Sequence, residues 1–445
     1  MKGEQNGALK QMADKEKVRI AFLGMGTVGQ GVWKHLQSSR ERMCARMGVE
    51  YELGPVGVRN PDKPRAVRIP RELLTGDLLS VATDPSADIV CELIGGTDDA
   101  LRLTLAALER GKTVVSANKA LICECGEQIF RTAEKFGGRF FFEASVAGGI
   151  PVIKILREGL VANGFSHIYG ILNGTCNYIL TRMERENAPF EDIIADARRL
   201  GYVEADESLD IDGFDAAHKI SVLTYLAHGI WVKPGQMILS GIRNVRLEDM
   251  LWASENGCRI KLIASVRAVG GGGAISVSVY PALVPLSNIV ANVDGVYNAV
   301  SLAGDVVGRT VHIGRGAGQD ATASAVIADI VDAAVSLRCG ACSNRLYPAK
   351  GGAYLAPLED VFGEFYLRLE VRDEAGVLAS IASILAARGI SIELLHQKRH
   401  PAKGMAWLLL TTHLTSEAAI KAACEDLRAS PCILGQPFLL RIMGE

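Results

Sequence analysis

The feature that most constrains the fold is a glycine pattern that follows a short apolar segment near the start of the chain. Residues 18–23 are mostly apolar and predict a buried strand, which leads into Gly24, Gly26 and Gly29 with the spacing G-x-G-x-x-G. In such a turn the first glycine permits a tight bend, the second lets a pyrophosphate approach the backbone, and the third lets the next helix pack closely on the strand. The pattern predicts a dinucleotide site; the alternative is an ordinary turn.

The segments after this turn alternate between strand and helix patterns. Helices are expected over about 30–46 and 101–109, and strands over 52–59, 88–94 and 113–116. Alternation of this kind predicts an α/β protein with a Rossmann-type, doubly wound parallel sheet.

From about residue 148 the pattern changes and predicts an α+β domain with a mixed sheet. The expected helices cover residues 152–160, 175–185, 191–200, 214–227 and 321–337, and the expected strands cover 167–172, 260–268 and 274–283. The last 80 or so residues follow a β-α-β-β-α-β order, which predicts a small ferredoxin-like unit. Its expected strands are 365–371, 390–397 and 406–412, and its expected helices are 377–388 and 417–428.

A chain of 445 residues is too long for one compact core, so several domains are expected. We predict a flexible tail over 1–17, a dinucleotide-binding domain over 18–147 that is completed by 316–338, an α+β domain over 148–315, a linker over 339–360 and a ferredoxin-like domain over 361–445. The family resemblances given below imply that 148–315 is a catalytic and dimerisation domain and that 361–445 is a regulatory domain.

The composition of the chain argues against several classes of function. The net charge of −2 argues against nucleic acid or an anionic membrane as a partner. No apolar stretch is long enough to span a bilayer, and the polar first 17 residues are unlike a secretory signal. The ten cysteines are dispersed through a chain able to form a core, so ordinary thiols in a reducing, cytoplasmic setting are expected. The spacing of Cys339 and Cys342 also occurs in metal and redox sites, but no second pair completes a set of zinc ligands.

Four segments resemble the homoserine dehydrogenase family. They are SANK at residues 116–119, EASVAGGIP at 143–151, GILNGTCNY at 170–178, and a stretch that begins LGYVEAD at residue 200 and continues to Lys219. The likeness covers about residues 18–335 in the family's order. It implies an enzyme that interconverts L-aspartate 4-semialdehyde and L-homoserine with NADP or NAD, in threonine and methionine biosynthesis.

The residues of the last segment suit this chemistry. Asp215 and Lys219 are four positions apart on a predicted helix and share a face, with Glu204 and Asp210 on the loop before it. Carboxylates can hold a substrate ammonium, and a lysine can exchange the hydroxyl proton. A lysine does this well only where burial or a second cation, here Lys119, lowers its pKa toward neutrality. An exposed helix salt bridge is the alternative interpretation of the Asp215 and Lys219 pair.

The glycine pattern and the resemblance together imply three sets of site residues. The catalytic set is Lys219, Lys119 and Asp215, and the substrate-binding set is Glu204, Asp215, Asp210, Tyr202, Thr175 and Gly174. The cofactor-binding set is Gly24, Gly26, Thr27, Val28, Gly29, Arg59, Thr97, Ser116, Lys119, Gly201 and Gly318. A monovalent cation, Na⁺ or K⁺, is implied at Glu143, Val146, Gly148 and Ile150, where the alternative is an ordinary glycine-rich turn.

Three positions in these sets have an alternative interpretation or depart from the family pattern. Arg59 follows the second predicted strand, where a cation can accommodate a 2′-phosphate, and this favours NADP; a solvated loop arginine is the alternative. Thr175 is either a substrate contact or simply the N-cap of its helix. After Gly318 the chain has Gln319 and Asp320, where the family pattern implies a proline-containing turn.

The C-terminal segment resembles the ACT domain family, which binds small amino acids. The resemblance rests on DEAGVL at residues 373–378 and GISI at 389–392, with Ala375 at the usual proline position. It implies L-threonine as a feedback inhibitor and a homo-oligomer, a dimer or a tetramer. A module that only dimerises is the alternative.

Two other functions compete with this interpretation. One is a different amino-acid or semialdehyde dehydrogenase on the same scaffold, and an acylating version would need an activated thiol such as Cys176. The other is a non-catalytic protein that senses nucleotide and amino acid, which would bind the cofactor without turnover.

Overall fold

The computed structural model describes residues 17–199, 207–339 and 352–444. The predicted tail, apart from Lys17, and much of the predicted linker lie outside these residues. The chain forms two compact units, which are described separately. The first comprises the described residues within 1–163, 221–233 and 312–350, and the second those within 164–220, 234–311 and 351–445.

The first unit contains a parallel sheet of six strands in the order β3-β2-β1-β4-β5-β6. The strands are β1 (Lys17–Leu23), β2 (Glu50–Gly57), β3 (Leu74–Thr75), β4 (Ile89–Glu92), β5 (Thr113–Ser116) and β6 (Arg139–Phe141). Every neighbouring pair along this order is parallel. The chain starts at the centre of the sheet and winds outward in both directions, which confirms the predicted doubly wound fold.

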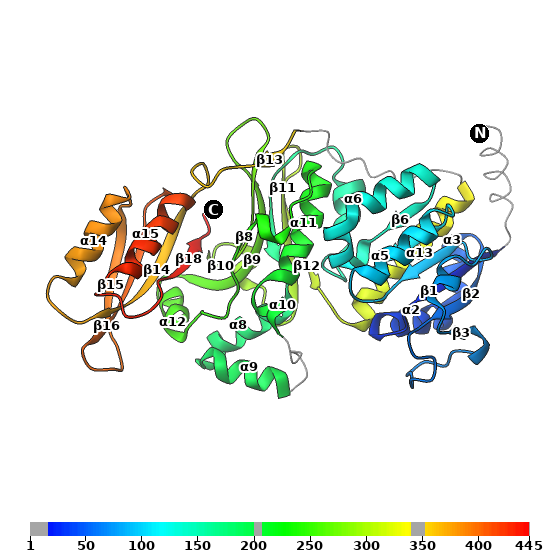
Figure 1. Cartoon of the computed structure of the whole chain (residues 1–445), viewed down its shortest axis with the longest axis horizontal. Helices are drawn as coiled ribbons and strands as arrows, with labels where there is room; N and C mark the ends of the chain where they lie inside the picture. Colours follow the sequence, from blue (N-terminus) through cyan, green and yellow to red (C-terminus); the bar gives the residue numbers. More distant parts are fainter. Residues whose placement is uncertain (1–16, 200–206, 340–351, 445) are drawn as a thin grey trace. The chain divides into compact units, whose positions relative to one another are not determined.

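Helices pack on this sheet in two groups. Helices α4 (Leu78–Ala82), α5 (Asp98–Leu108) and α6 (Lys119–Phe136) contact one another in sequence order, and α2 (Thr27–Ser38) and α3 (Arg40–Met47) contact α13 (Gln319–Cys339). Figure 1 shows α13, in yellow, among the blue and cyan elements that precede it by almost 200 residues or more. Its apolar residues Ala323, Val326 and Ile330 complete the core around Phe22 and Trp33.

Two predicted helices differ from the observed ones. The single helix expected over 30–46 is two helices, because the backbone leaves the helical conformation at Ser39. The helix expected over 152–160 is only α7 (Val152–Lys154), which continues as a π-helical turn over Ile155–Gly159. Both differences concern local hydrogen-bond geometry, which an apolar periodicity does not specify.

The second unit contains a mixed sheet in the order β12-β11-β7-β9-β10-β18-β14-β16-β15. Its first half consists of β7 (Phe165–Ile171), β9 (Cys258–Ala268), β10 (Ala274–Pro285), β11 (Tyr297–Gly304) and β12 (Gly308–Arg315). The glycine run at 270–273 connects β9 to β10. These two strands pair antiparallel, with eleven paired residues on each strand. The helices of this part are α8 (Gly174–Glu186), α9 (Phe190–Arg199), α10 (Ser208–Ile211), α11 (Phe214–His228) and α12 (Leu247–Glu255).

The C-terminal part has the predicted ferredoxin-like order. It consists of β14 (Phe362–Arg372), α14 (Val377–Ala387), β15 (Ile392–Arg399), β16 (Met405–Thr412), α15 (Glu417–Ala429) and β18 (Phe438–Ile442). Short strands β8 (Ile238–Leu239) and β13 (Tyr354–Leu355) pair with β10, and β17 (Thr415–Ser416) pairs with β14. The last strand, β18, pairs with β14 on one side and with β10 on the other, so one sheet runs through both halves of the unit.

A buried ion pair joins these two halves of the second unit. Asp249 on α12 is fully buried and accepts hydrogen bonds at 2.8 Å from Arg368 Nε and from the Tyr366 hydroxyl, both on β14. The Trp252 ring packs at a tilt of 45° against the Tyr366 ring, with 4.8 Å between the ring centroids. The C-terminal part is therefore held to the preceding part by a desolvated contact as well as by strand pairing. Among the described residues, no helix has both the length and the apolar character needed to cross a membrane.

Candidate active site

The glycine turn has the geometry that a dinucleotide site requires. Gly24 has a φ of +98° and a side chain there would meet the Leu93 carbonyl oxygen at 2.6 Å. A side chain at Gly29 would lie 2.7 Å from the Gly24 carbonyl oxygen, whereas a Cβ at Gly26 would point into open space. The open side of Gly26 at the start of α2 is the cradle that a pyrophosphate would occupy, so the residues present fit a nicotinamide dinucleotide.

Other residues of the predicted cofactor set lie at the same edge of the sheet. Ser116 is the last residue of β5, Lys119 is the first residue of α6, and Thr97 immediately precedes α5. Arg59 lies two residues after β2, with 81% of its side chain exposed and its guanidinium 3.9 Å from Asp99. Gly318 immediately precedes α13 with a φ of +117°.

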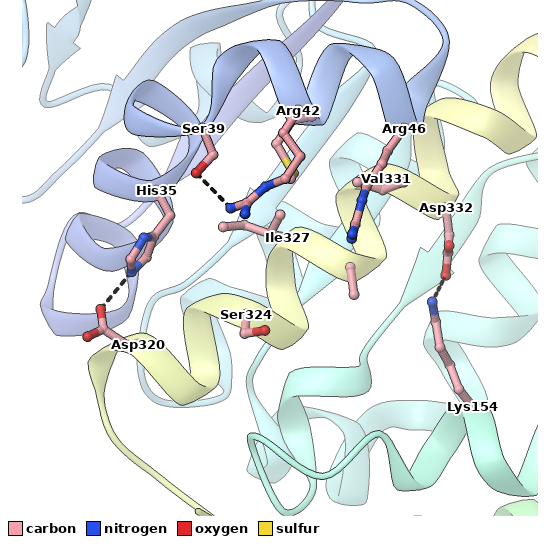
Figure 2. Close-up of a pocket in the computed structure, with 12 residues that line it drawn as sticks. His35, Ser39, Arg42, Arg46, Lys154, Asp320, Ser324, Ile327, Val331 and Asp332 are labelled. Atoms are coloured by element: carbon pink, nitrogen blue, oxygen red, sulfur yellow. Dashed lines mark hydrogen bonds and ion pairs between the residues drawn. The ribbon is translucent and has the colours of Figure 1, made fainter.

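A groove of about 570 Å³ in the first unit lies among α2, α3 and α13 (Figure 2). Two ion pairs, His35 with Asp320 and Lys154 with Asp332, lie along it, and Arg46 extends from α3 toward α13. None of the described residues that line this groove belongs to the predicted site. Its charged groups largely satisfy one another, so we assign it no ligand.

The second unit contains a buried cluster of polar side chains around Lys219. The Lys219 ammonium donates to Asp215 Oδ2 and to the Leu172 carbonyl oxygen, both at 2.7 Å. Lys219 and Asp215 are only 7% and 6% exposed. The alternative of an exposed helix salt bridge is therefore wrong, because α11 turns this face toward the interior.

Asn173 connects this pair to the preceding loop. Its Nδ2 donates to Asp215 Oδ2 at 2.8 Å and to Asp210 Oδ1 at 2.7 Å, so two carboxylates converge on one amide, and one of them also accepts from Lys219. Its Oδ1 accepts from the Cys176 amide at 2.8 Å and caps α8. The N-cap is therefore Asn173, and the alternative role of Thr175 as the cap is wrong; Thr175 and Gly174 lie in the first turn of the helix.

Three residues of the predicted site lie outside the described residues. They are Gly201, Tyr202 and Glu204. The described chain resumes at Glu207, before α10, and Asp210 lies within that short helix.

The Glu143 carboxylate has backbone partners. It accepts hydrogen bonds from the amides of Ile153 and Lys154 at 2.9 and 2.8 Å, and so caps α7. Burial raises the pKa of Glu143 to about 7 in spite of these bonds. The Glu143 amide donates to the buried Asp329 on α13 at 2.8 Å. A cation held by this segment would therefore rely on backbone carbonyl oxygens, such as those of Val146, Gly148 and Ile150.

Cys176 lacks the features of a nucleophilic thiol. Burial is the largest of the causes that raise its pKa well above the ordinary value, and the nearby carboxylates of Asp210 and Asp215 add to the effect. Its Sγ donates to the Asp210 carbonyl oxygen at 3.2 Å. An acylating dehydrogenase needs an accessible thiolate, so this competing function loses its candidate residue.

Comparison with known proteins agrees with the fold and the glycine turn. Residues 24–143 match the family described as "Homoserine dehydrogenase, NAD binding domain", residues 151–331 match "Homoserine dehydrogenase", and residues 365–431 match "ACT domain". Together, the doubly wound sheet, its glycine turn and the matched binding domain define an NAD(P)-dependent oxidoreductase.

Full-length relatives identify the family. A homoserine dehydrogenase from Neisseria gonorrhoeae is 40% identical over 94% of this chain and 96% of its own length. One from Pseudomonas aeruginosa is 39% identical over 96% and 98%. The crystal structure of a homoserine dehydrogenase from Thiobacillus denitrificans, 40% identical, aligns with a TM-score of 0.89 over 96% of this chain and 98% of that one. The chain belongs to the homoserine dehydrogenase family.

Proposed function

We propose that this chain interconverts L-aspartate 4-semialdehyde and L-homoserine, with Lys219 as the general acid and base. The observation that carries the proposal is the buried ammonium of Lys219, held between Asp215 and the Leu172 carbonyl. A cation fixed in this way, next to a second carboxylate on Asp210, offers both a proton and a counter-charge for an amino-acid substrate.

The chain's own residues account for the proton and for substrate orientation. The Lys219 Nζ donates to Asp215 Oδ2 at 2.7 Å, which fixes the position of the group that is proposed to give a proton to the aldehyde oxygen in reduction and to take it from the hydroxyl in oxidation. Asp210, together with Glu204, is proposed to hold the substrate ammonium. The bound nicotinamide cofactor supplies the hydride in reduction and accepts it in oxidation. Lys119, at the start of α6, is proposed to contact cofactor and substrate.

For the cofactor we propose NADP in preference to NAD, through a 2′-phosphate contact with Arg59. In support, a related archaeal homoserine dehydrogenase, 28% identical over 72% of this chain and 98% of that one, with a TM-score of 0.58, was solved in complex with NADPH. We also propose a Na⁺ or K⁺ ion of structural role on the carbonyls of the segment 143–150.

The test is absorbance at 340 nm with L-homoserine and NADP or NAD, with wild type beside Lys219→Met and Lys219→Arg. Losing a general acid or base costs about 10²- to 10⁴-fold in kcat, and we expect that loss in the methionine variant with cofactor affinity kept. Lys219→Arg keeps the charge next to Asp215 and controls for stability, since only proton transfer is impaired. Cofactor binding with no wild-type turnover of homoserine would favour the non-catalytic sensing protein instead.

We propose further that the ACT domain makes the enzyme sensitive to L-threonine and that the chain forms a dimer or tetramer. The apolar side chains of Val306 and Val307, in the turn between β11 and β12, are 73% and 46% exposed and suit a subunit interface. Deleting the domain is a poor test, because it removes β18 from β10 and Arg368 from Asp249. Inhibition should instead be titrated on the intact chain with L-threonine, and with isosteric L-valine as the control. Activity and calorimetric binding unaffected by threonine would contradict the proposal, and light scattering tests the oligomer.

A further inference from the structure

A fully buried carboxylate lies at the carboxyl edge of the parallel sheet, beside the residues expected to contact the cofactor. Glu92 is the last residue of β4 and has no exposed surface. Burial raises its pKa to about 7, against the opposing effect of its hydrogen bonds. Strand β4 pairs with both neighbouring strands through its backbone, so the sheet does not require a polar side chain at this position, and an apolar one would serve.

Two hydrogen-bond donors meet the Glu92 carboxylate, one from the loop after β4 and one from the end of β5. The Ile94 amide donates to Oε1 at 3.0 Å, and the Ser116 hydroxyl donates to Oε2 at 2.5 Å. The loop after β4 and the end of β5 therefore share one anchor. The Asn118 Nδ2 also ties the two segments together, since it donates to the Ile94 carbonyl oxygen at 3.2 Å.

The same hydrogen bonds continue from Glu92 to the start of α6. The Asn118 amide donates to the Ser116 hydroxyl oxygen at 3.0 Å. Asn118 Oδ1 accepts from Leu121 N at 3.1 Å and caps α6, while its Nδ2 donates to the Gly96 carbonyl oxygen at 2.7 Å. Lys119 is the next residue and the first of the helix. The backbone position of Lys119 is thus set by a cap that depends on Ser116, and Ser116 in turn is oriented by Glu92.

We propose that Glu92 is a positioning residue that fixes Lys119 for the reaction through Ser116 and Asn118. The inference rests on the proposed function, since it assigns Lys119 a part in turnover. A carboxylate suits this position because each of its two oxygens accepts from one of the two donors, whereas an amide has one acceptor oxygen and an apolar side chain has none.

The experiment is a double-mutant cycle between Glu92→Leu and Lys119→Ala in the full chain, with kcat, KM and NADPH affinity measured for each variant. Misplacing a contacting group by about 1 Å costs on the order of 10²-fold, so we expect Glu92→Leu to lower kcat by about 10- to 100-fold. KM for homoserine and the Kd for NADPH should each stay within about threefold of wild type. In the double variant kcat should be no more than about twofold below that of Lys119→Ala, because the group being positioned is already gone.

Three further variants keep the test decisive. Thr113→Val removes a buried hydroxyl at the opposite end of β5, one with no hydrogen-bond partner among the described residues, and should leave kcat unchanged. If Glu92→Leu does not fold, Asn118→Ala, which breaks the same chain of hydrogen bonds, replaces it in the cycle. Glu92→Gln keeps the shape and one acceptor, and should recover part of the kcat lost in Glu92→Leu.

Each outcome has a separate meaning. Independent losses that multiply in the double variant would overturn the inference and leave Glu92 a structural residue. A Lys119→Ala variant with wild-type turnover would end both the role of Lys119 and the inference drawn from it. The role of Lys219 is measured separately by its own variants, so failure of the proposed reaction is recognised independently.

Discussion

Asn173 offers a direct way to separate the site from the helix that carries it. Its oxygen caps α8 at the Cys176 amide, whereas its nitrogen donates to Asp210 and Asp215. Asn173→Ala removes both functions. Asn173→Asp keeps an oxygen for the cap and removes only the two donors. The pair of variants therefore distinguishes a residue that organises the carboxylates from one that merely begins a helix.

The contacts give the expected size of each effect. Loss of an N-cap costs about 1 kcal/mol, and a hydrogen bond to a charged group contributes about 1.5–3 kcal/mol. Asp210 is only half-buried and water replaces part of its bond, so we expect Asn173→Ala to lower the free energy of unfolding by about 3 kcal/mol. Asn173→Asp restores the cap but places a third carboxylate beside two others. Its stability should therefore be lower at pH 8 than at pH 5.5, where one carboxyl can hold a proton.

The assay compares kcat/KM for homoserine at 340 nm with thermal unfolding of the same samples. Because the amide orients the carboxylate that holds Lys219, we expect both variants to lose on the order of 10- to 100-fold in kcat/KM. If kcat/KM of Asn173→Asp stays within about threefold of wild type while that of Asn173→Ala falls, the reasoning is refuted. Asn173 would then act only as a helix cap.

Three further changes test other parts of the structure. Arg59→Ala should raise KM for NADPH about tenfold and hardly change that for NADH, because the exposed guanidinium has no 2′-phosphate to meet in NADH; equal changes would contradict this. The pKa of Glu143 is raised from 4.5 to about 7, so the folded protein holds this proton more tightly than the unfolded chain does. The free energy of unfolding of the wild type should therefore fall by about 3 kcal/mol as the pH rises through that interval. Glu143→Gln should remove this part of the pH dependence in urea unfolding at pH 5 and 8, and an unchanged difference would count against it. Asp249→Ala leaves the buried Arg368 guanidinium without its carboxylate and should cost about 3–5 kcal/mol, so a cost below about 1 kcal/mol would exclude a desolvated pair.

Those parts of this protein that depend on local pattern can be predicted from the amino-acid sequence. The apolar run and glycine spacing at residues 18–29 predict a strand, a tight turn and a helix, since these patterns depend on residues that are close together in the chain, as where Gly29 packs on the Gly24 carbonyl oxygen. The alternation of strands and helices predicts the parallel sheet for a similar reason. The motifs at residues 116–119, 143–151, 170–178 and 200–219 together indicate the family.

Only the tertiary structure decided how the polar side chains combine. Asp215 and Lys219 have the spacing of many exposed pairs, and their burial follows from how α11 packs. Asn173 meets carboxylates 37 and 42 positions away, and Glu92 meets a serine 24 positions away. Hydrogen bonds of this kind join segments that are adjacent only after the strands have paired. A periodicity carries no information about them, because it records which face of an element is apolar and not what that face will meet.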